Sequence, residues 1–165
     1  MTFSCKVIEA FFDYNHDFNE DHSIVAAIYR LIYRCKNASP GYFLFIETQI
    51  RKSGDQCNLA SEFFELVKSA MNNILTGDWS WSQISRLFYA INLIDDVASF
   101  RLVPSEQKKL REIIVEIVGR RLSFIEEMDW KVIPIIELAE EETHQFNWID
   151  FALGAAVALV IRRYF

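Results

Sequence analysis

The sequence contains few of the residues that interrupt helices. Its 165 residues include only 5 glycines and 3 prolines. These residues fall mostly between apolar stretches whose hydrophobic positions repeat at helical spacing, and the alternating pattern of a β-strand is scarce. The low glycine and proline content therefore argues against a sheet-rich architecture and predicts an all-α fold.

Cysteine is also scarce. The chain has three, Cys5, Cys35 and Cys57, with no CxxC spacing between them. An odd number of widely separated cysteines does not form a disulfide framework, and without clustered histidines it does not form a zinc site. We expect three reduced thiols in a protein that works inside a cell.

Positive charge is in deficit, since 17 Lys and Arg stand against 23 Asp and Glu, for a net charge of -6. No stripe of basic residues is present to neutralise a phosphate backbone, which excludes nucleic acid as the expected partner. The first residues, MTFSCKVIEAFF, lack a basic region followed by an apolar run and do not resemble a secretory signal. We expect synthesis in the cytosol.

Catalytic and metal-binding patterns are missing as well. Asp95 and Asp96 are adjacent, so on a helix their side chains point about 100 degrees apart and do not form a carboxylate pair. The Gly54-Asp55 pair lacks the spacing of a phosphate-binding loop. The remaining candidates, three scattered histidines and a glutamate run, read as solvated surface: His16, His22, His144, Glu140, Glu141 and Glu142. We expect no enzyme activity, no cofactor and no metal site.

Hydrophobic residues, by contrast, make up 52% of the chain, and 14 of them are phenylalanine. This is enough apolar material for one domain with a substantial core, which we place at residues 1–146, followed by an apolar segment at 147–165. Polar residues after Tyr14 and a turn at Asn37–Gly41 separate the first helices. The hydrophobic spacing predicts about eight or nine helices, among them 3–14, 22–36, 42–52, 59–75, 81–100 and 105–120.

The stretch TGDWSWSQISRLFYAINLIDDVASF predicts the centre of the fold. Ser80 and Gln83 have the spacing of a capping box, which places the helix start near Trp81. The apolar residues of this helix cover too many faces for a surface helix: Ile84, Leu87, Phe88, Ile91, Leu93, Ile94, Val97 and Phe100. The sequence thus predicts one hydrophobic helix buried at the centre of a helical bundle.

A buried central helix entered through a tryptophan-bearing turn resembles the Bcl-2 family of apoptosis regulators. The family's first homology motif, an asparagine, tryptophan, glycine and arginine before an apolar helix, corresponds to Ser80, Trp81, Ser82 and Gln83. The tryptophan and the apolar helix are present, but the arginine is not. The family's second motif, Trp-Ile and a later Trp, corresponds to Phe124, Ile125 and Trp130, without the double glycine.

The third homology motif has two placements. The literal one uses Ile50, Gly54 and Asp55, which match the family pattern but leave only about 20 residues between the motif and the end of the next helix at Leu75, so that one helix is lost. The other makes the helix at 22–36 the motif helix, with Leu31 and Cys35 at the corresponding positions. The number of helices favours the second placement, in which the motif is degenerate, as in virus-encoded members of the family.

The resemblance implies a Bcl-2-like helical bundle that holds an amphipathic death-motif helix of a pro-apoptotic family protein in a surface groove. The implied function is pro-survival, in the cytoplasm or at the mitochondrial outer membrane, of a host cell if the chain is viral. By analogy the groove walls come from the second to the fifth helices: Ile28, Leu31, Ile32, Cys35, Phe45, Phe64, Val67, Met71, Ile74, Gln83, Ser85, Arg86 and Phe88. For most of these residues, the alternative interpretation is a place in the core.

In the family the motif arginine pairs with an aspartate of the ligand. Gln83 offers only a neutral hydrogen bond, a loss of about 1 kcal/mol, and its amide is expected to cap Ser80. Arg86 lies three residues further on, on the same helical face, and is the natural substitute. The alternative for Arg86 is an ordinary surface salt bridge.

The C-terminal segment and two other functions remain open. Phe146-Asn147-Trp148 leads into an apolar stretch that is short for a membrane span, so 148–163 is a candidate tail anchor, a helix folded onto the chain's own groove, or a last bundle helix. One alternative function is a pro-apoptotic effector that permeabilises membranes. The other is a Bcl-2-like fold that inhibits innate immune signalling, and a homodimer fits this alternative.

Overall fold

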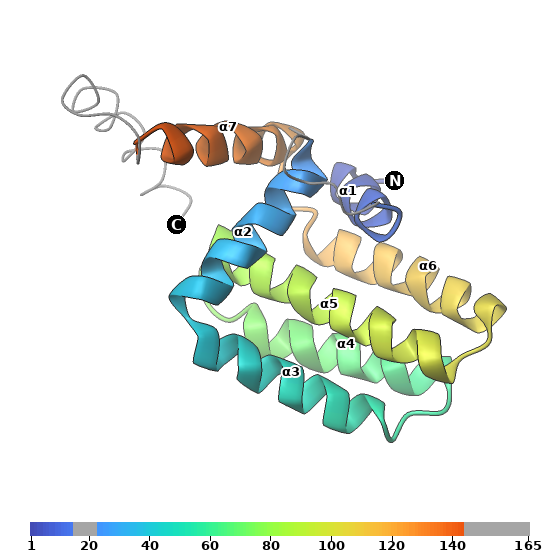
Figure 1. Cartoon of the computed structure of the whole chain (residues 1–165). Helices are drawn as coiled ribbons and strands as arrows, with labels where there is room; N and C mark the ends of the chain where they lie inside the picture. The colour runs from blue at the N-terminus through green and yellow to red at the C-terminus, as the bar shows by residue number, and fades with distance from the viewer. Residues whose placement is uncertain (15–22, 144–165) are drawn as a thin grey trace.

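The computed structural model describes residues 1–14 and 23–143, with side chains to residue 135. These residues form seven helices, which Figure 1 labels in chain order. They are α1 (Phe3–Phe12), α2 (Ile24–Ala38), α3 (Pro40–Gly54), α4 (Ala60–Ile74), α5 (Trp81–Arg101), α6 (Pro104–Arg121) and α7 (Glu127–Thr143). The described part of the chain contains no strand, so the all-α prediction is confirmed.

The predicted count of eight or nine helices is higher than the seven that these residues form. A single helix, α7, passes through Pro134 and ends at Thr143, where the sequence suggested an aromatic segment and a separate acidic stretch. The predicted helix within 147–165 lies outside the described residues. The described residues therefore form a helical bundle. A Bcl-2-like arrangement of its helices stays a prediction.

Hydroxyl side chains cap the N-terminal ends of several helices. Thr2 accepts a hydrogen bond from the Cys5 N–H, and Ser23 accepts one from the Ala26 N–H. Each satisfies a backbone donor that the first turn of a helix leaves without a partner. The turn predicted at Asn37–Gly41 is shorter than expected, since Ser39 alone separates α2 from α3. Pro40 occupies the first turn of α3, where its missing N–H costs nothing.

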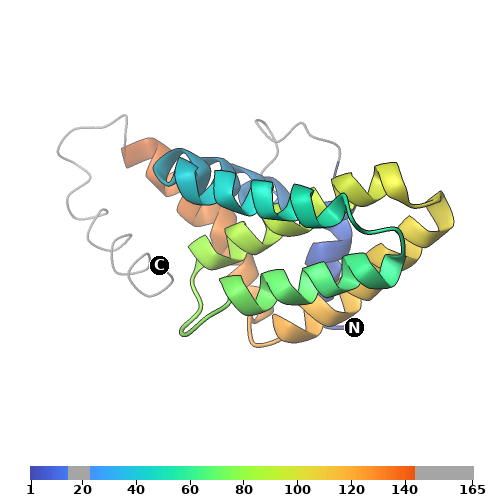
Figure 2. The same cartoon turned by 90° about the horizontal axis from the view of Figure 1, so that it is seen from below.

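Helix α5 lies at the centre of the bundle, and α2, α3 and α4 each pack along it. Figures 1 and 2 show these helices gathered around α5, with α6 on a further side. Before its last turn, only Asn92 and Asp96 of this helix are exposed. The prediction of a central buried helix is confirmed. Phe100 is the exception, since it is 83% exposed in the last turn of α5.

The two tryptophan-bearing ends of the core meet beside α1. Trp81 and Trp130 are fully buried, and their rings lie edge to face with centroids 5.3 Å apart. The indole N–H of Trp130 donates to the Ser4 hydroxyl at 3.0 Å, and this hydroxyl donates to the Leu122 carbonyl at 2.8 Å. These bonds join α1, the end of α6 and α7, so the buried Trp130 indole N–H and the buried Ser4 hydroxyl both have partners.

A glycine allows α1 and α6 to pack closely. A Cβ placed on Gly119 would overlap the Cys5 sulfur and lie 3.0 Å from the Cys5 Cα. We expect Gly119→Ala to lower the free energy of unfolding by about 2 to 3 kcal/mol, because a backbone atom cannot move aside as a side chain can. Denaturant unfolding would measure this change. Gly41→Ala is the control, because a Cβ there meets nothing within 4 Å and alanine favours the helix. Equal effects of the two substitutions would contradict the prediction.

Candidate peptide-binding groove

A groove separates α3 from α4 along the side of α5. The two helices run in opposite directions across the short connection between Asp55 and Leu59, and both pack more extensively on α5 than on each other. The hollow between them has a volume of about 250 Å³. Its lining comes from three helices: Tyr42, Phe45, Ile46, Gln49, Ile50, Ser53, Leu66, Ser69, Ala70, Asn73, Ile74 and Ala90.

The groove has an apolar floor and an uncharged rim. Ile46, Ile50, Ile74 and Ala90 are buried beneath it, whereas Phe45 is 60% exposed at its edge. The polar side chains of the lining are amides and hydroxyls, and no lining residue carries a charge. An apolar trench with neutral edges suits the apolar face of an amphipathic helix.

Arg86 supplies a positive charge at one end of this groove. Its guanidinium lies over the ring of Tyr42, a lining residue, at 4.3 Å from the ring centroid. The Nε of Arg86 is buried and has no hydrogen-bond partner, and within the described residues Arg86 forms no salt bridge. A buried donor without an acceptor costs about 1 to 3 kcal/mol. The stacking on Tyr42 offsets part of this cost, and an incoming carboxylate would supply the missing acceptor.

Gln83 caps the start of α5. Its Oε1 accepts from the Ser80 N–H at 2.9 Å, and its Nε2 donates to the Thr76 carbonyl at 2.9 Å. The Gln83 N–H in turn donates to the Ser80 hydroxyl at 3.2 Å. The predicted capping box is confirmed, and both the oxygen and the nitrogen of the Gln83 amide already bond to the backbone at the start of α5.

The structure divides the predicted groove residues between groove and core. Phe45 and Ile74 line the groove, and Arg86 stands at its end. Cys35 is half-buried, with its thiol 3.9 Å from the Ser82 hydroxyl, and Phe64 is half-buried beneath Lys68. The others with predicted wall roles are buried in the core, where they support the helices: Ile28, Leu31, Ile32, Val67, Met71, Ser85 and Phe88.

The two motif segments meet in space. Trp81 of the first segment packs on Trp130 of the second, and Trp79 lies 5.5 Å from Phe124 between ring centroids. Ile125 is buried with them, whereas Phe124 is 48% exposed. Of the two placements for the third motif, one lies on α2 and the other at the end of α3, where Asp55 pairs with Arg101.

Several lining residues escaped the sequence analysis, above all Tyr42, Gln49 and Ser53 of α3. Their signal was present as a spacing of three and four residues along one helix face. Tyr42, Phe45 and Gln49 already share one face of the helix predicted at 42–52, but their mixed polarity does not distinguish a groove lining from an exposed surface. Ser53 lies just beyond the predicted end of that helix.

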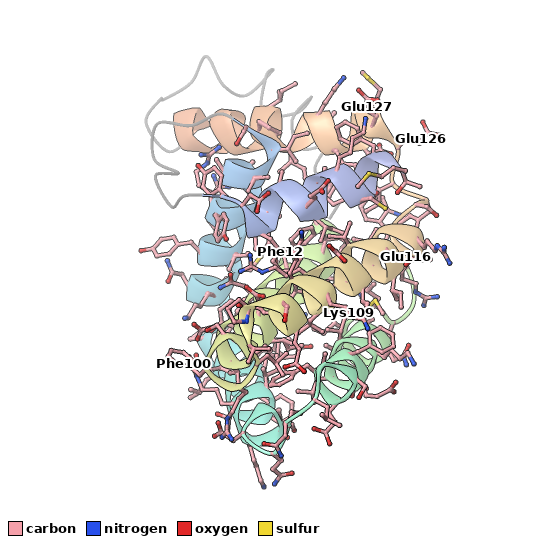
Figure 3. All side chains as sticks on the ribbon, turned by 90° about the vertical axis from the view of Figure 1, so that its right-hand side faces the viewer. Phe12, Phe100, Lys109, Glu116, Glu126 and Glu127 are labelled. Carbon is pink, nitrogen blue, oxygen red and sulfur yellow. The ribbon has the colours of Figure 1, made fainter. Side chains whose placement is uncertain are left out.

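A larger hollow, of about 820 Å³, lies between α1 and α6, on the side that Figure 3 shows. Its lining mixes charges of both signs, and two of its cations already have partners: Arg111 binds Asp95, and Arg120 binds Glu116. This hollow is the larger of the two sites, but its charged lining suits the apolar face of a helix less well than the uncharged lining of the α3–α4 groove does. The groove is the better candidate for an amphipathic helix, because its lining is uncharged around an apolar floor and the buried Nε of Arg86 lies at its end.

Other kinds of site are not apparent in the described part of the chain. No group of three or more His, Cys, Asp or Glu residues gathers there as metal ligands would. None of the helices within residues 1–14 and 23–143 is both long and apolar enough to cross a bilayer. The candidate tail anchor at 148–163, and His16, His22 and His144, lie outside the described residues. The side chains of Glu140, Glu141 and Glu142 are likewise not described.

Comparison with known proteins adds no relative. No protein-family model, no curated protein and no solved structure matches the chain.

Proposed function

We propose that the chain is a pro-survival regulator that binds amphipathic death-motif helices of pro-apoptotic Bcl-2 family proteins in the α3–α4 groove. The observation that carries the proposal is Arg86. Its guanidinium stands at the end of an apolar groove with a buried Nε that lacks an acceptor. A helix that presents apolar anchors and one carboxylate would fill the groove and complete this donor.

In this proposal Arg86 takes the role of the missing motif arginine. Gln83 is held by Ser80 and Thr76, so a ligand carboxylate would find its cation one helical turn further along α5. Arg86 and Ala90 are four residues apart, so the cation and the groove floor share one face of α5. The groove would therefore recognise a ligand both through its carboxylate, at Arg86, and through its apolar side chains, on the groove floor.

Binding of labelled peptides to the full chain tests the proposal. We expect death-motif helices to bind and scrambled peptides of the same composition not to bind. Phe45→Glu should weaken binding at least about tenfold, because it places a charge in the apolar trench. The matched control is Leu44→Glu, since Leu44 is 64% exposed on the same helix but does not line the groove.

Three outcomes would count against the proposal. Binding of no death-motif helix would favour inhibition of innate signalling by a fold whose groove is blocked. Equal losses in Phe45→Glu and Leu44→Glu would place the bound helix elsewhere. Release of dye from liposomes by the chain alone would favour a membrane-permeabilising effector. Association with the mitochondrial outer membrane would depend on 147–165, and its removal would test that separately.

A further inference from the structure

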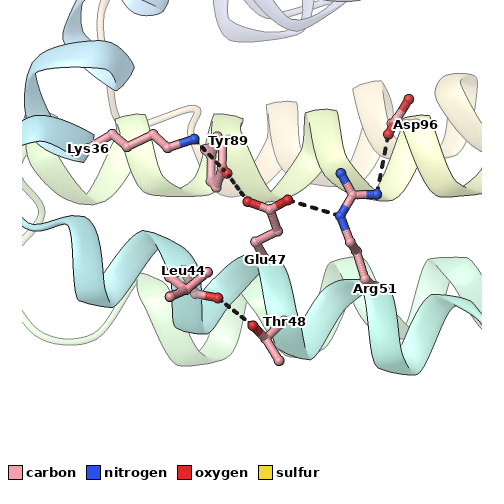
Figure 4. Close-up of polar contacts among 7 residues, drawn as sticks. All are labelled: Lys36, Leu44, Glu47, Thr48, Arg51, Tyr89 and Asp96. Atoms are coloured by element: carbon pink, nitrogen blue, oxygen red, sulfur yellow. Dashed lines mark hydrogen bonds and ion pairs between the residues drawn. The ribbon is translucent and has the colours of Figure 1, made fainter.

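Helix α5 holds the beginning of α3 at both edges. Arg86 reaches Tyr42 on the groove side, and Tyr89, three residues later, reaches Glu47 on the other side. Figure 4 shows this second edge, where side chains of α2, α3 and α5 form a connected row of polar contacts. The groove uses the first edge of α3, whereas the second edge has no place in the binding scheme described above.

The contacts of the second edge converge on Glu47 and Tyr89. One carboxylate oxygen of Glu47 accepts from the Tyr89 hydroxyl at 3.0 Å, and the other accepts from Arg51 Nε at 3.0 Å. Lys36 Nζ donates to the Tyr89 hydroxyl at 3.4 Å. The hydrogen bonds from Arg51 and Tyr89 lower the pKa of Glu47, so it accepts as a carboxylate at neutral pH. The Tyr89 ring also packs on buried Phe43, with centroids 5.0 Å apart.

Helix α3 is free of close support on its groove side. It packs on α5 through Phe43, Ile46 and Ile50, while its contacts with α4 are few. The separation of α3 from α4, and so the width of the groove, therefore depends on how α3 sits on α5. A polar tether on the far edge resists rotation of α3 about its own axis.

We propose that Tyr89 and Glu47 form a latch that fixes α3 on α5 and keeps the α3–α4 groove at the width that a helical ligand needs. That the latch serves ligand binding rests on the proposed function. That it fixes α3 on α5 does not depend on any ligand. Both residues act as positioning residues, since neither lines the groove. We expect the two residues to fix the position of α3 rather than to raise the stability of the whole fold, because an exposed ion pair such as Glu47 and Arg51 adds little to overall stability.

Hydrogen exchange without any ligand tests the latch. Tyr89→Phe removes the hydroxyl but keeps the ring on Phe43. We expect the amides of α3 to exchange at least about threefold faster, in line with the loss of one hydrogen bond, while α4 and α6 are unchanged. Thr48→Ala is the control, because it removes only an exposed bond to the Leu44 carbonyl of the same helix. Unchanged exchange in α3, or an equal increase in every helix, would overturn the latch.

Peptide binding tests the link between latch and groove. With the death-motif peptide that binds the wild-type chain most tightly, Tyr89→Phe and Glu47→Ala should each raise Kd at least about threefold, since a loosened α3 must be ordered by the ligand. Glu47→Gln should restore near wild-type binding, because its amide oxygen still accepts from Tyr89. If Tyr89→Phe speeds amide exchange in α3 but leaves the Kd of the peptide unchanged, the latch does not serve binding in the groove. If the wild-type chain binds no death-motif helix, the proposed function of the groove is wrong. The latch would then be tested by hydrogen exchange alone.

Discussion

Replacing Trp130 with alanine should lower the free energy of unfolding by about 4 kcal/mol, the upper part of the range for a buried aromatic side chain. Trp130 is fully buried and packs on both Trp81 and Phe88, with ring centroids 5.3 and 6.1 Å away. The substitution also removes the donor to the Ser4 hydroxyl. Small domains have only about 5 to 15 kcal/mol in total, so the variant should be close to unfolding.

Denaturant unfolding followed by circular dichroism would measure this loss. Trp130→Phe separates packing from hydrogen bonding, because it keeps a ring but removes the bond to Ser4, and we expect a smaller loss of about 1 to 3 kcal/mol. Met128→Ala is the surface control, since Met128 is 66% exposed on the same helix. A loss below about 1.5 kcal/mol in Trp130→Ala would mean that α7 is not an integral part of the core.

The sequence predicts the centre of the fold well because local and global signals agree there. The capping box of Ser80 and Gln83 sets the start of α5, and the apolar residues that follow require burial on nearly all sides. Phe100 shows the limit of this reasoning. Its apolar character predicts burial, but Phe100 is 83% exposed while Ala98 in the same turn is buried, because burial depends on which side of the helix its neighbours cover. Periodicity reports which residues favour a core, not how far the core extends.

The groove was less predictable than the fold. Residues such as Ile28, Val67 and Phe88 have the apolar character of both a core and a groove wall, and sequence alone does not separate these two roles. Which of the two roles a residue has depends on how α3 and α4 pack on α5, and Gly54 takes part in that packing. A Cβ on Gly54 would lie only 2.8 Å from Val97 Cγ1, so this glycine lets the end of α3 approach α5.

Charge was more informative than hydrophobicity at this site. The sequence favours Arg86 because it follows Gln83 by three residues on one helical face, and in the structure it lies against the ring of Tyr42. The alternative of an ordinary surface salt bridge is not seen, since Arg86 forms no ion pair within the described residues. Its role in binding stays a prediction.

Arg86→Ala should weaken the binding of a death-motif helix by roughly 30-fold or more, because removal of one partner from a desolvated charge pair costs about 2 to 5 kcal/mol. Arg86→Glu should abolish measurable binding, since it would face a ligand carboxylate with a like charge. Arg86→Lys should bind with intermediate affinity, because lysine keeps the charge but loses the planar, two-pronged geometry. Titration of a labelled peptide gives these affinities.

A double-mutant cycle distinguishes direct pairing from an indirect effect. If Arg86 holds the ligand carboxylate, Asp→Asn in the peptide should cost much less in Arg86→Ala than in the wild-type chain, with a coupling energy of at least about 1.5 kcal/mol. Lys52→Ala is the control for general electrostatics, because Lys52 is exposed on α3 and does not line the groove. Folding should be little affected by Arg86→Ala, since the substitution removes a buried donor that has no acceptor along with the contact to Tyr42. Additive losses in the cycle would show that the carboxylate binds elsewhere, and Arg86 would then serve only to hold Tyr42 at the edge of the groove.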